Sequence, residues 1–413
     1  MLPAPDPTRP LVRLNPARLI LVGLVLALAL GAVALPYHLA ERAGTRTLTD
    51  FDIFHLAGGM AWDGTLAEAY DAHRFQALQS EISGRRGNML WMYPPQFGLL
   101  GAALALLPVW LAFLAFTGGT LAAYVLVLRR LAGEQFGIVL LAMLPTLLIG
   151  IAMGQNGFLT GTLLGLFLLL APEGRRAAGV PLGLMVLKPH LALGLGAWLL
   201  FAGRWRWLLQ AAATVAATAL LATVTLGPGI WPAFLAGAAQ AKALLGEGGY
   251  SLHRMTSAFA LLRSLGVGSG VALALHAVVA LGALAAIHLA LRQGWEPRRS
   301  LAAATVASLL ASPYLYEYDM TVLGLALALA ARDLAAPGVR RLAPLVVGLA
   351  WFVSLYAYGS GWLTYQRYLA GAELGLEDRP VALSAAAVLV LTALLLAVLR
   401  RAERSAVGAP VPA

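Results

Sequence analysis

Long apolar stretches alternate with short polar segments along almost the entire chain. About twelve of them are apolar enough to lie in a bilayer; they cover residues 17–35, 109–128, 134–153, 157–171, 177–187, 190–203, 207–226, 270–291, 300–312, 320–331, 342–357 and 381–399. Several are shorter than the roughly 20 residues that a full crossing requires. Short segments broken by Pro or Gly are tolerated only where protein buries them or where they line a cavity. The pattern predicts an all-α, polytopic integral membrane protein with about 12 transmembrane or re-entrant helices.

Three longer polar segments separate these stretches, at about residues 36–95, 227–268 and 358–380. In the first of them, Ala69, Phe75, Leu78 and Ile82 recur near a 3.6-residue period, which predicts an amphipathic helix at the membrane surface. No internal repeat or soluble domain is recognisable, so residues 1–404 are predicted to form one membrane domain. Residues 405–413 are predicted to be a disordered cytoplasmic tail.

The composition indicates that lipid is the solvent of this chain. Hydrophobic residues make up 60% of it and charged residues 12%, whereas soluble domains carry roughly a quarter charged residues. The net charge of +10 does not indicate nucleic-acid binding, because the basic residues form short clusters between apolar stretches. The chain has no Cys, which excludes disulfides and thiolate metal sites.

These basic clusters also predict the orientation. If the N-terminus is cytoplasmic, most of the 29 basic residues fall on the cytoplasmic side, among them Arg9, Arg129 and Arg298, and most acidic residues fall outside, among them Glu373 and Glu377. Both termini are then cytoplasmic, and the three long loops face outward. The alternative is a cleavable signal peptide ending near Ala32-Val33-Ala34, but the first apolar stretch is long for a signal sequence.

Polar residues at the ends of apolar stretches are the functional candidates, because they are costly at membrane depth. Asp50 and Asp52 begin the first outer loop. Tyr93 closes the same loop. The other candidates lie on later outward connections: Gln155, Asn156, Lys188, His190, His253, Arg254, Tyr314, Glu317 and Asp319. Their convergence on one face predicts a site there.

Each candidate also has a structural interpretation. The aspartates can cap a helix, and Gln155-Asn156 between glycines can form a simple turn. Tyr93-Pro94-Pro95 can start a helix below an interfacial aromatic residue. Lys188 can extend its amine to the surface. Glu317 and Asp319 can form salt bridges with Arg254 or Arg367.

Several short motifs occur in an order that resembles glycosyltransferase family 87. They are Asp50-Phe51 with Phe54, Ala57-Gly58, Gly64 and Ala69-Tyr70-Asp71, then Tyr93-Pro94-Pro95, Leu107-Pro108, Gly154-Gln155-Asn156-Gly157, Lys188-Pro189 and Ser312-Pro313-Tyr314. None is specific alone, but their order and spacing extend from about residue 50 to 320. Tyr318-Asp319 after the Ser-Pro motif is similar to the bacterial branch of the family.

This resemblance implies a membrane enzyme of the GT-C architecture in the bacterial plasma membrane. It implies transfer of a hexose, mannose in the best-understood members, from a polyprenyl-phosphate sugar to an extracytoplasmic glycan or glycolipid. The position that matches the family's base is Asp50. Asp52 is additional to the pattern and leaves two alternatives open: it shares that role, or it forms a carboxylate pair with Asp50 for a divalent metal. Otherwise no cofactor is expected.

The residue types suit this chemistry on their own account. Inverting glycosyl transfer needs a carboxylate to take the proton of the acceptor hydroxyl, and a departing phosphate needs cationic stabilisation. Lys188, His190, His253 and Arg254 are the candidates for the phosphate. Tyr93, Gln155, Asn156, Tyr314, Glu317 and Asp319 are the candidates for substrate binding. No alternation of strands and helices indicates a site for a sugar nucleotide.

Two other functions fit a polytopic chain with broken helices. A transporter or flippase of lipid-linked glycans is one, although no pseudo-repeat of two halves is visible and the charged groups gather at one face. An inactive scaffold for cell-envelope assembly is the other, and the intact acidic motif argues against it.

Overall fold

The computed structural model describes residues 10–13, 15–43, 48–85, 87–370, 372, 375–376 and 378–407. Within these ranges the chain is helical and has no strand, only an isolated bridge between Met255 and Tyr316. The all-α prediction is therefore confirmed. Among the described residues, six helical segments are long and apolar enough to cross a membrane, so the structure supports a polytopic membrane protein but does not confirm the predicted count of about 12.

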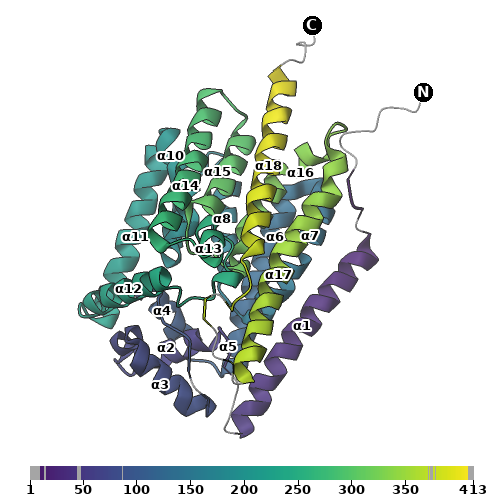
Figure 1. The fold of residues 1–413 in the computed structure, drawn as a ribbon. Helices are drawn as coiled ribbons and strands as arrows, with labels where there is room; N and C mark the ends of the chain where they lie inside the picture. Colours follow the sequence, from purple (N-terminus) through teal and green to yellow (C-terminus); the bar gives the residue numbers. More distant parts are fainter. Residues whose placement is uncertain are drawn as a thin grey trace.

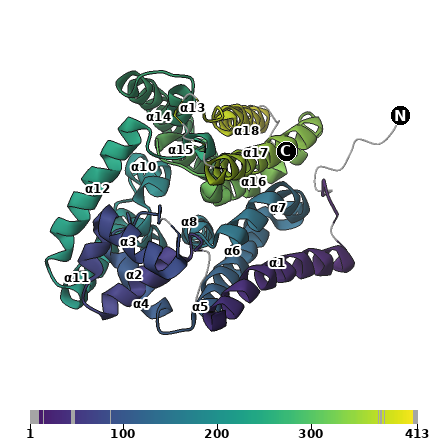
Figure 2. The ribbon, with the colours of Figure 1, turned by 60° about the horizontal axis from the view of Figure 1, so that its bottom comes forward.

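The longest helices form the outside of the bundle and expose apolar side chains such as Leu209, Leu220 and Val224 of α11, as expected of surfaces that face lipid. Figure 2 shows α1 on one flank, α11 and α12 on another, and α8 near the centre. The helices of this outer group are α1 (Pro16–Ala43), α11 (Trp205–Leu226), α14 (Ser269–Arg292), α17 (Ala343–Leu369) and α18 (Leu383–Val407).

Shorter helices fill the interior. They are α8 (Gly157–Leu170), α9 (Gly179–Leu184), α10 (Leu193–Phe201), α15 (Pro297–Ala311) and α16 (Thr321–Ala335). The continuous segment of α5 (Val109–Phe113), the π-helical turn η2 (Leu114–Gly118) and α6 (Gly119–Ala132) packs beside them, as does α7 (Phe136–Met153). α16 is buried along almost all of its length, which explains why its sequence is apolar on every side.

One end of the bundle, which we call the loop end, carries α2 (Asp52–Trp62), α3 (Ala72–Ser83) and α4 (Pro95–Leu104), with α12 (Ile230–Glu247) beside them (Figure 1). α13 (Ala258–Ser264) lies deeper in the bundle, against α14 and α18. Short 3₁₀ turns complete the connections: η1 (Leu66–Tyr70), η3 (Gly133–Gln135), η4 (Met185–Leu187), η5 (Pro189–Ala192), η6 (Leu252–Arg254), η7 (Glu317–Met320) and η8 (Arg340–Leu342). α18 ends at the opposite end of the bundle (Figure 1).

The inner helices stop short of the loop end. Ala171, just after α8, and Trp205, the first residue of α11, line one cavity and so share a level at the opposite end. From that level the 14 residues of α8 reach about 21 Å, and the 22 residues of α11 reach about 33 Å. The loop-end terminus of α8 is therefore recessed within the bundle.

Several predicted boundaries differ from the structure. α1 continues to Ala43 and α17 to Leu369, so the first and third loops begin later than residues 36 and 358. The first two loops are largely helical, because α2, α3, α12 and α13 bury part of their surface against the bundle. The amphipathic helix expected near residues 69–82 is present as α3, and Phe75 is its buried apolar residue.

The C-terminal helix α18 includes residues 405–407, which we expected to belong to the tail. Residues 408–413 lie outside the described residues, as do Arg9, Glu373 and Glu377.

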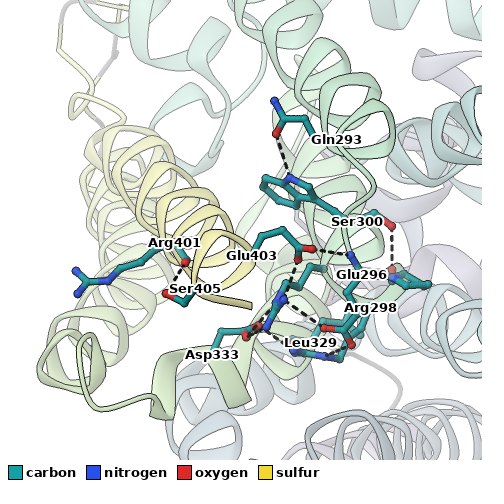
Figure 3. Close-up of polar contacts among 12 residues, drawn as sticks. Gln293, Glu296, Arg298, Ser300, Leu329, Asp333, Arg401, Glu403 and Ser405 are labelled. Atoms are coloured by element: carbon teal, nitrogen blue, oxygen red, sulfur yellow. Dashed lines mark hydrogen bonds and ion pairs between the residues drawn. The ribbon is translucent and has the colours of Figure 1, made fainter. Parts of the chain in front are cut away.

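An ion cluster joins α15, α16 and α18 at the opposite end (Figure 3). Asp333 accepts from Arg298 at 3.0 Å and from Arg299 at 3.1 Å. Arg299 also pairs with Glu403 at 2.8 Å. Both oxygens of Asp333 are thus bonded to guanidinium groups, and these charges connect three helices.

Candidate active site

The predicted site residues come together where the inner helices end at the loop end. Two glycines in the turn between α7 and α8 allow this approach. Gly154 has φ +63°, a conformation that favours glycine, and a Cβ there would lie 2.6 Å from Cβ of Phe51. A Cβ on Gly157 would lie 2.1 Å from the backbone oxygen of Tyr318. The first loop and the segment before α16 therefore pack directly on this turn.

Asp50 is held by a line of hydrogen bonds that crosses three segments. Tyr93 donates its hydroxyl to Oε1 of Gln155 at 3.0 Å, and Gln155 donates through Nε2 to Oδ2 of Asp50 at 3.2 Å. Tyr70 donates to the backbone oxygen of Tyr93 at 2.8 Å. Tyr93 also stacks on Phe97, with ring centroids 4.5 Å apart. Gln155 therefore orients Asp50. Tyr70 of the first loop in turn positions Tyr93, which holds Gln155 in place.

Asp52 lies in a different environment, although it is two residues away. Its side chain is fully buried, and Oδ2 accepts from the backbone nitrogen of Thr49 at 2.6 Å and the hydroxyl of Tyr37 at 3.1 Å. These contacts join the start of α2 to α1. Among the described residues no group of three or more His, Cys, Asp or Glu side chains could hold a metal ion.

Two buried ion pairs lie on alternate residues of η7. Lys188 Nζ contacts Oδ1 of Asp319 at 2.8 Å, with 6% and 0% of the side chains exposed. Arg254 pairs with Oε1 of Glu317 through Nε at 3.0 Å and also through Nη2. The expected pairing of Glu317 with Arg254 is thus present. Asp319 pairs instead with Lys188, which sits in the break between η4 and η5.

The charges of Arg254 and Lys188 affect the pKa of Asp50. Burial raises the pKa of the Asp50 carboxyl above its ordinary value, while the charge of Arg254, the hydrogen bond from Gln155 and the charge of Lys188 oppose that rise. Asp50 is therefore a stronger base than an exposed aspartate and lies close to two cations. Lys188, Arg254, Asp319, Glu317 and Asp50 sum to a single negative charge when all are ionised.

Tyrosine rings form one wall of the site. Tyr314 contacts Tyr250 and Tyr316, each with centroids 5.2 Å apart, and Tyr316 stacks on Tyr318 at 5.4 Å. Lys188 Nζ lies 4.6 Å from the centre of the Tyr318 ring, and the Arg254 guanidinium lies 5.5 Å from that of Tyr316. Tyr250, Tyr316 and Tyr318 were not among the site residues predicted from the sequence, although tyrosines at every second position from 314 to 318 were a visible signal.

The two histidines differ from their predicted role as cations. Burial, together with the charges of Arg254 and Arg379, lowers the pKa of His253 to about 4, so His253 is neutral near pH 7. His190 lies edge-on to Tyr314, with centroids 6.2 Å apart. Among the described residues neither ring contacts a carboxylate, and each has one buried nitrogen without a hydrogen-bond partner.

Unsatisfied polar atoms also mark the centre of the site. The side chain of Asn156 is fully buried, and neither its amide nitrogen nor its oxygen has a partner in the described structure. Oε2 of Glu317 is likewise without one. Such groups are costly to bury and can donate to, or accept from, the hydroxyls of a bound ligand.

The sequence of this region matches a known family. The model of glycosyltransferase family 87 matches residues 91–313, more than half of the chain. The match includes Tyr93, Gln155, Lys188 and Arg254. No curated protein and no solved structure matches the chain.

Proposed function

Because the chain belongs to glycosyltransferase family 87, and is therefore a glycosyltransferase, we propose that it transfers a hexosyl residue, specifically mannose, from a polyprenyl-phosphate sugar. The acceptor in this proposal is a glycan or glycolipid outside the cytoplasm. The enzyme would lie in a bacterial plasma membrane, with cytoplasmic termini and the loop end outward. The observation that carries the proposal is a partly buried carboxylate, Asp50, bonded to Gln155 and close to two cations.

Asp50 is proposed as the general base. As the acceptor oxygen attacks the anomeric carbon, Asp50 takes the hydroxyl proton, and the bond between that carbon and the phosphate oxygen breaks. A raised pKa suits this role, because a stronger base removes the proton more readily. The leaving group is already a phosphate, so the step requires no general acid.

Lys188 and Arg254 are proposed to stabilise the departing phosphate. Each is paired with one carboxylate, but neither is saturated: an ammonium has three N–H donors and a guanidinium five. Lys188 uses one contact on Asp319, and Arg254 uses Nε and Nη2 on Glu317. The remaining donors can bind phosphate while the acids hold the cations in place.

The recess supports a lipid-linked donor. The site lies where short inner helices end, below the level that α11 reaches, so a phosphate bound there sits at membrane depth, where an isoprenoid chain can extend into lipid. Asn156, Tyr93, Gln155, Tyr314, Glu317 and Asp319 are proposed to contact the sugar and the acceptor. His190 and His253 would contribute hydrogen bonds rather than charge.

The test is sugar transfer from a synthetic polyprenyl-phosphate mannose in liposomes. Asp50→Asn keeps the size of the side chain but cannot take a proton, so we expect a loss of roughly 10²–10⁴-fold in transfer with donor binding retained. The matched control is Asp52→Asn, which changes the same atoms at the buried contact with Tyr37 and should lose far less activity per folded molecule.

Adding EDTA to the same assay separates the metal alternative. We expect no effect, because Asp52 is directed toward Tyr37 and Thr49. A severe loss in Asp52→Asn together with EDTA sensitivity would make the pair a metal site. Full activity of both variants would reject the carboxylate mechanism.

A further inference from the structure

A cavity lies at the opposite end of the bundle, far along α8 from the site. It has a volume of about 490 Å³ and is formed by the loop after α8, around Pro172 and Gly174, and by residues Gly203–Trp207 at the start of α11. Small-molecule sites are commonly about 300–1,000 Å³. The volume is therefore that of a ligand site, and the candidate active site does not account for it.

The cavity is rich in positive charge that the protein does not neutralise. Arg204 and Arg206 line it and are exposed, and within the described part of the chain no carboxylate pairs with either. The nearest acid in the sequence of the loop, Glu173, already pairs with Arg175 at 2.9 Å. The cavity thus suits an anion.

Aromatic side chains fix the shape of this basic cavity. Trp207 is 8% exposed and donates its Nε1 to the backbone oxygen of Arg175 at 3.1 Å, which ties α11 to the loop after α8. The Arg204 guanidinium lies 5.8 Å from the centre of the Trp207 ring. Trp205 is 57% exposed, as is common for Trp at the interface between membrane and water.

The cavity opens beside a surface that faces lipid. α11 continues from it with exposed apolar residues, including Leu209, which is 69% exposed. A ligand bound here would therefore meet arginines and tryptophans at one level and an apolar helix face immediately beside them. This arrangement, a basic cavity next to an apolar helix face, complements an amphiphile with an anionic headgroup.

We propose that this cavity binds the phosphate headgroup of an anionic phospholipid, whose acyl chains lie along α11. Basic pockets between membrane helices attract such headgroups. Inorganic phosphate and glycerol phosphate share the headgroup chemistry, but they have no acyl chain that could pack against the apolar face of α11. The proposal is independent of sugar transfer, because the cavity contains no residue of the candidate active site.

The test is native mass spectrometry of the full chain in micelles that contain equal amounts of phosphatidylglycerol and phosphatidylcholine. We expect the wild type to retain phosphatidylglycerol preferentially. The double variant Arg204→Gln/Arg206→Gln should lose about tenfold or more of this retention, since each arginine near a membrane surface contributes a several-fold effect. The matched control is Arg340→Gln/Arg341→Gln, which removes the same charge from an exposed pair beside α17 and should retain the lipid.

A second arm distinguishes the source of the phosphate. Millimolar glycerol phosphate should not displace the bound phosphatidylglycerol. Displacement would overturn the assignment to lipid and make this a site for a soluble anion. Equal losses in the two double variants, or no loss in either, would show that the cavity has no specific role in lipid binding.

Discussion

The two ends of α15 and α16 carry similar charged and polar groups, but these groups differ in how fully their hydrogen-bonding atoms are paired. At one end both oxygens of Asp333 accept from arginines, and Glu403 is also engaged. At the other end, within the part of the chain that the structure describes, one buried oxygen of Glu317 and two side-chain atoms of Asn156 have no hydrogen-bond partner, and Asp50 sits within a set of charges that does not balance. Saturated charges tie helices together, whereas unsatisfied ones are available to a ligand. We therefore assign stability to the first set and function to the second.

The largest effect on stability is expected at the saturated end. Asp333→Asn leaves Arg298 and Arg299 half-paired, and breaking a buried ion pair by removing one partner costs about 3 kcal/mol or more. We expect lower thermal stability in detergent and unchanged transfer activity per folded molecule. Loss of activity without loss of stability in this variant would contradict the assignment.

The cations of the site are expected to affect both steps of catalysis. Lys188→Ala and Arg254→Ala should each raise the KM for the donor and lower turnover, because losing a charge-assisted contact costs about 1.5–3 kcal/mol, on the order of tenfold or more. Removing Lys188 alone also leaves Asp319 buried without its partner. The control is Lys188→Met/Asp319→Asn, which should recover stability but not activity. Kinetics like those of the wild type in both alanine variants would return these residues to a purely structural role.

A smaller effect is expected for the residue that orients Asp50. Transfer requires ionised Asp50, so activity should fall as the pH falls through its pKa, which lies above the ordinary value. The hydrogen bond from Gln155 lowers that pKa, so Gln155→Leu should move the acidic limb of the pH profile to higher pH. The hydrogen bond from Gln155 to Asp50 is long, at 3.2 Å, so its loss should reduce turnover less than the loss of Lys188 or Arg254. The measurement is turnover as a function of pH for the wild type and the variant. If the acidic limb of the profile does not move, Gln155 does not affect the pKa of Asp50.

The sequence predicted most of the apolar helices, because long apolar stretches have few alternatives to the helix in lipid. It did not count α4 among the apolar stretches, although Tyr93-Pro94-Pro95 was compatible with a helix start, and it placed α12 in the second loop. Chemistry at the turns was visible in Gly154-Gln155-Asn156-Gly157 and Lys188-Pro189. The pairing of Lys188 with Asp319 was not, because it joins residues 131 positions apart and depends on how the break between η4 and η5 meets η7.

The distinction between Asp50 and Asp52 shows the same limit. Two carboxylates two residues apart looked equivalent, or like a metal-binding pair. The start of α2 at Asp52 places that side chain against Tyr37 and Thr49 and leaves Asp50 beside Gln155. That outcome depends on where one helix begins and on what packs against it, and neither can be read from residue spacing.

The most direct test of the central claim measures transfer activity and thermal stability together in Asp50→Asn and Asp333→Asn. Both substitutions replace one carboxylate by its isosteric amide, at opposite ends of the inner helices. We expect Asp50→Asn to keep its stability and to lose roughly 10²–10⁴-fold in activity, and Asp333→Asn to lose stability and keep its activity per folded molecule. Asp50→Asn with full activity, or with activity lost only in proportion to unfolding, would contradict the central claim.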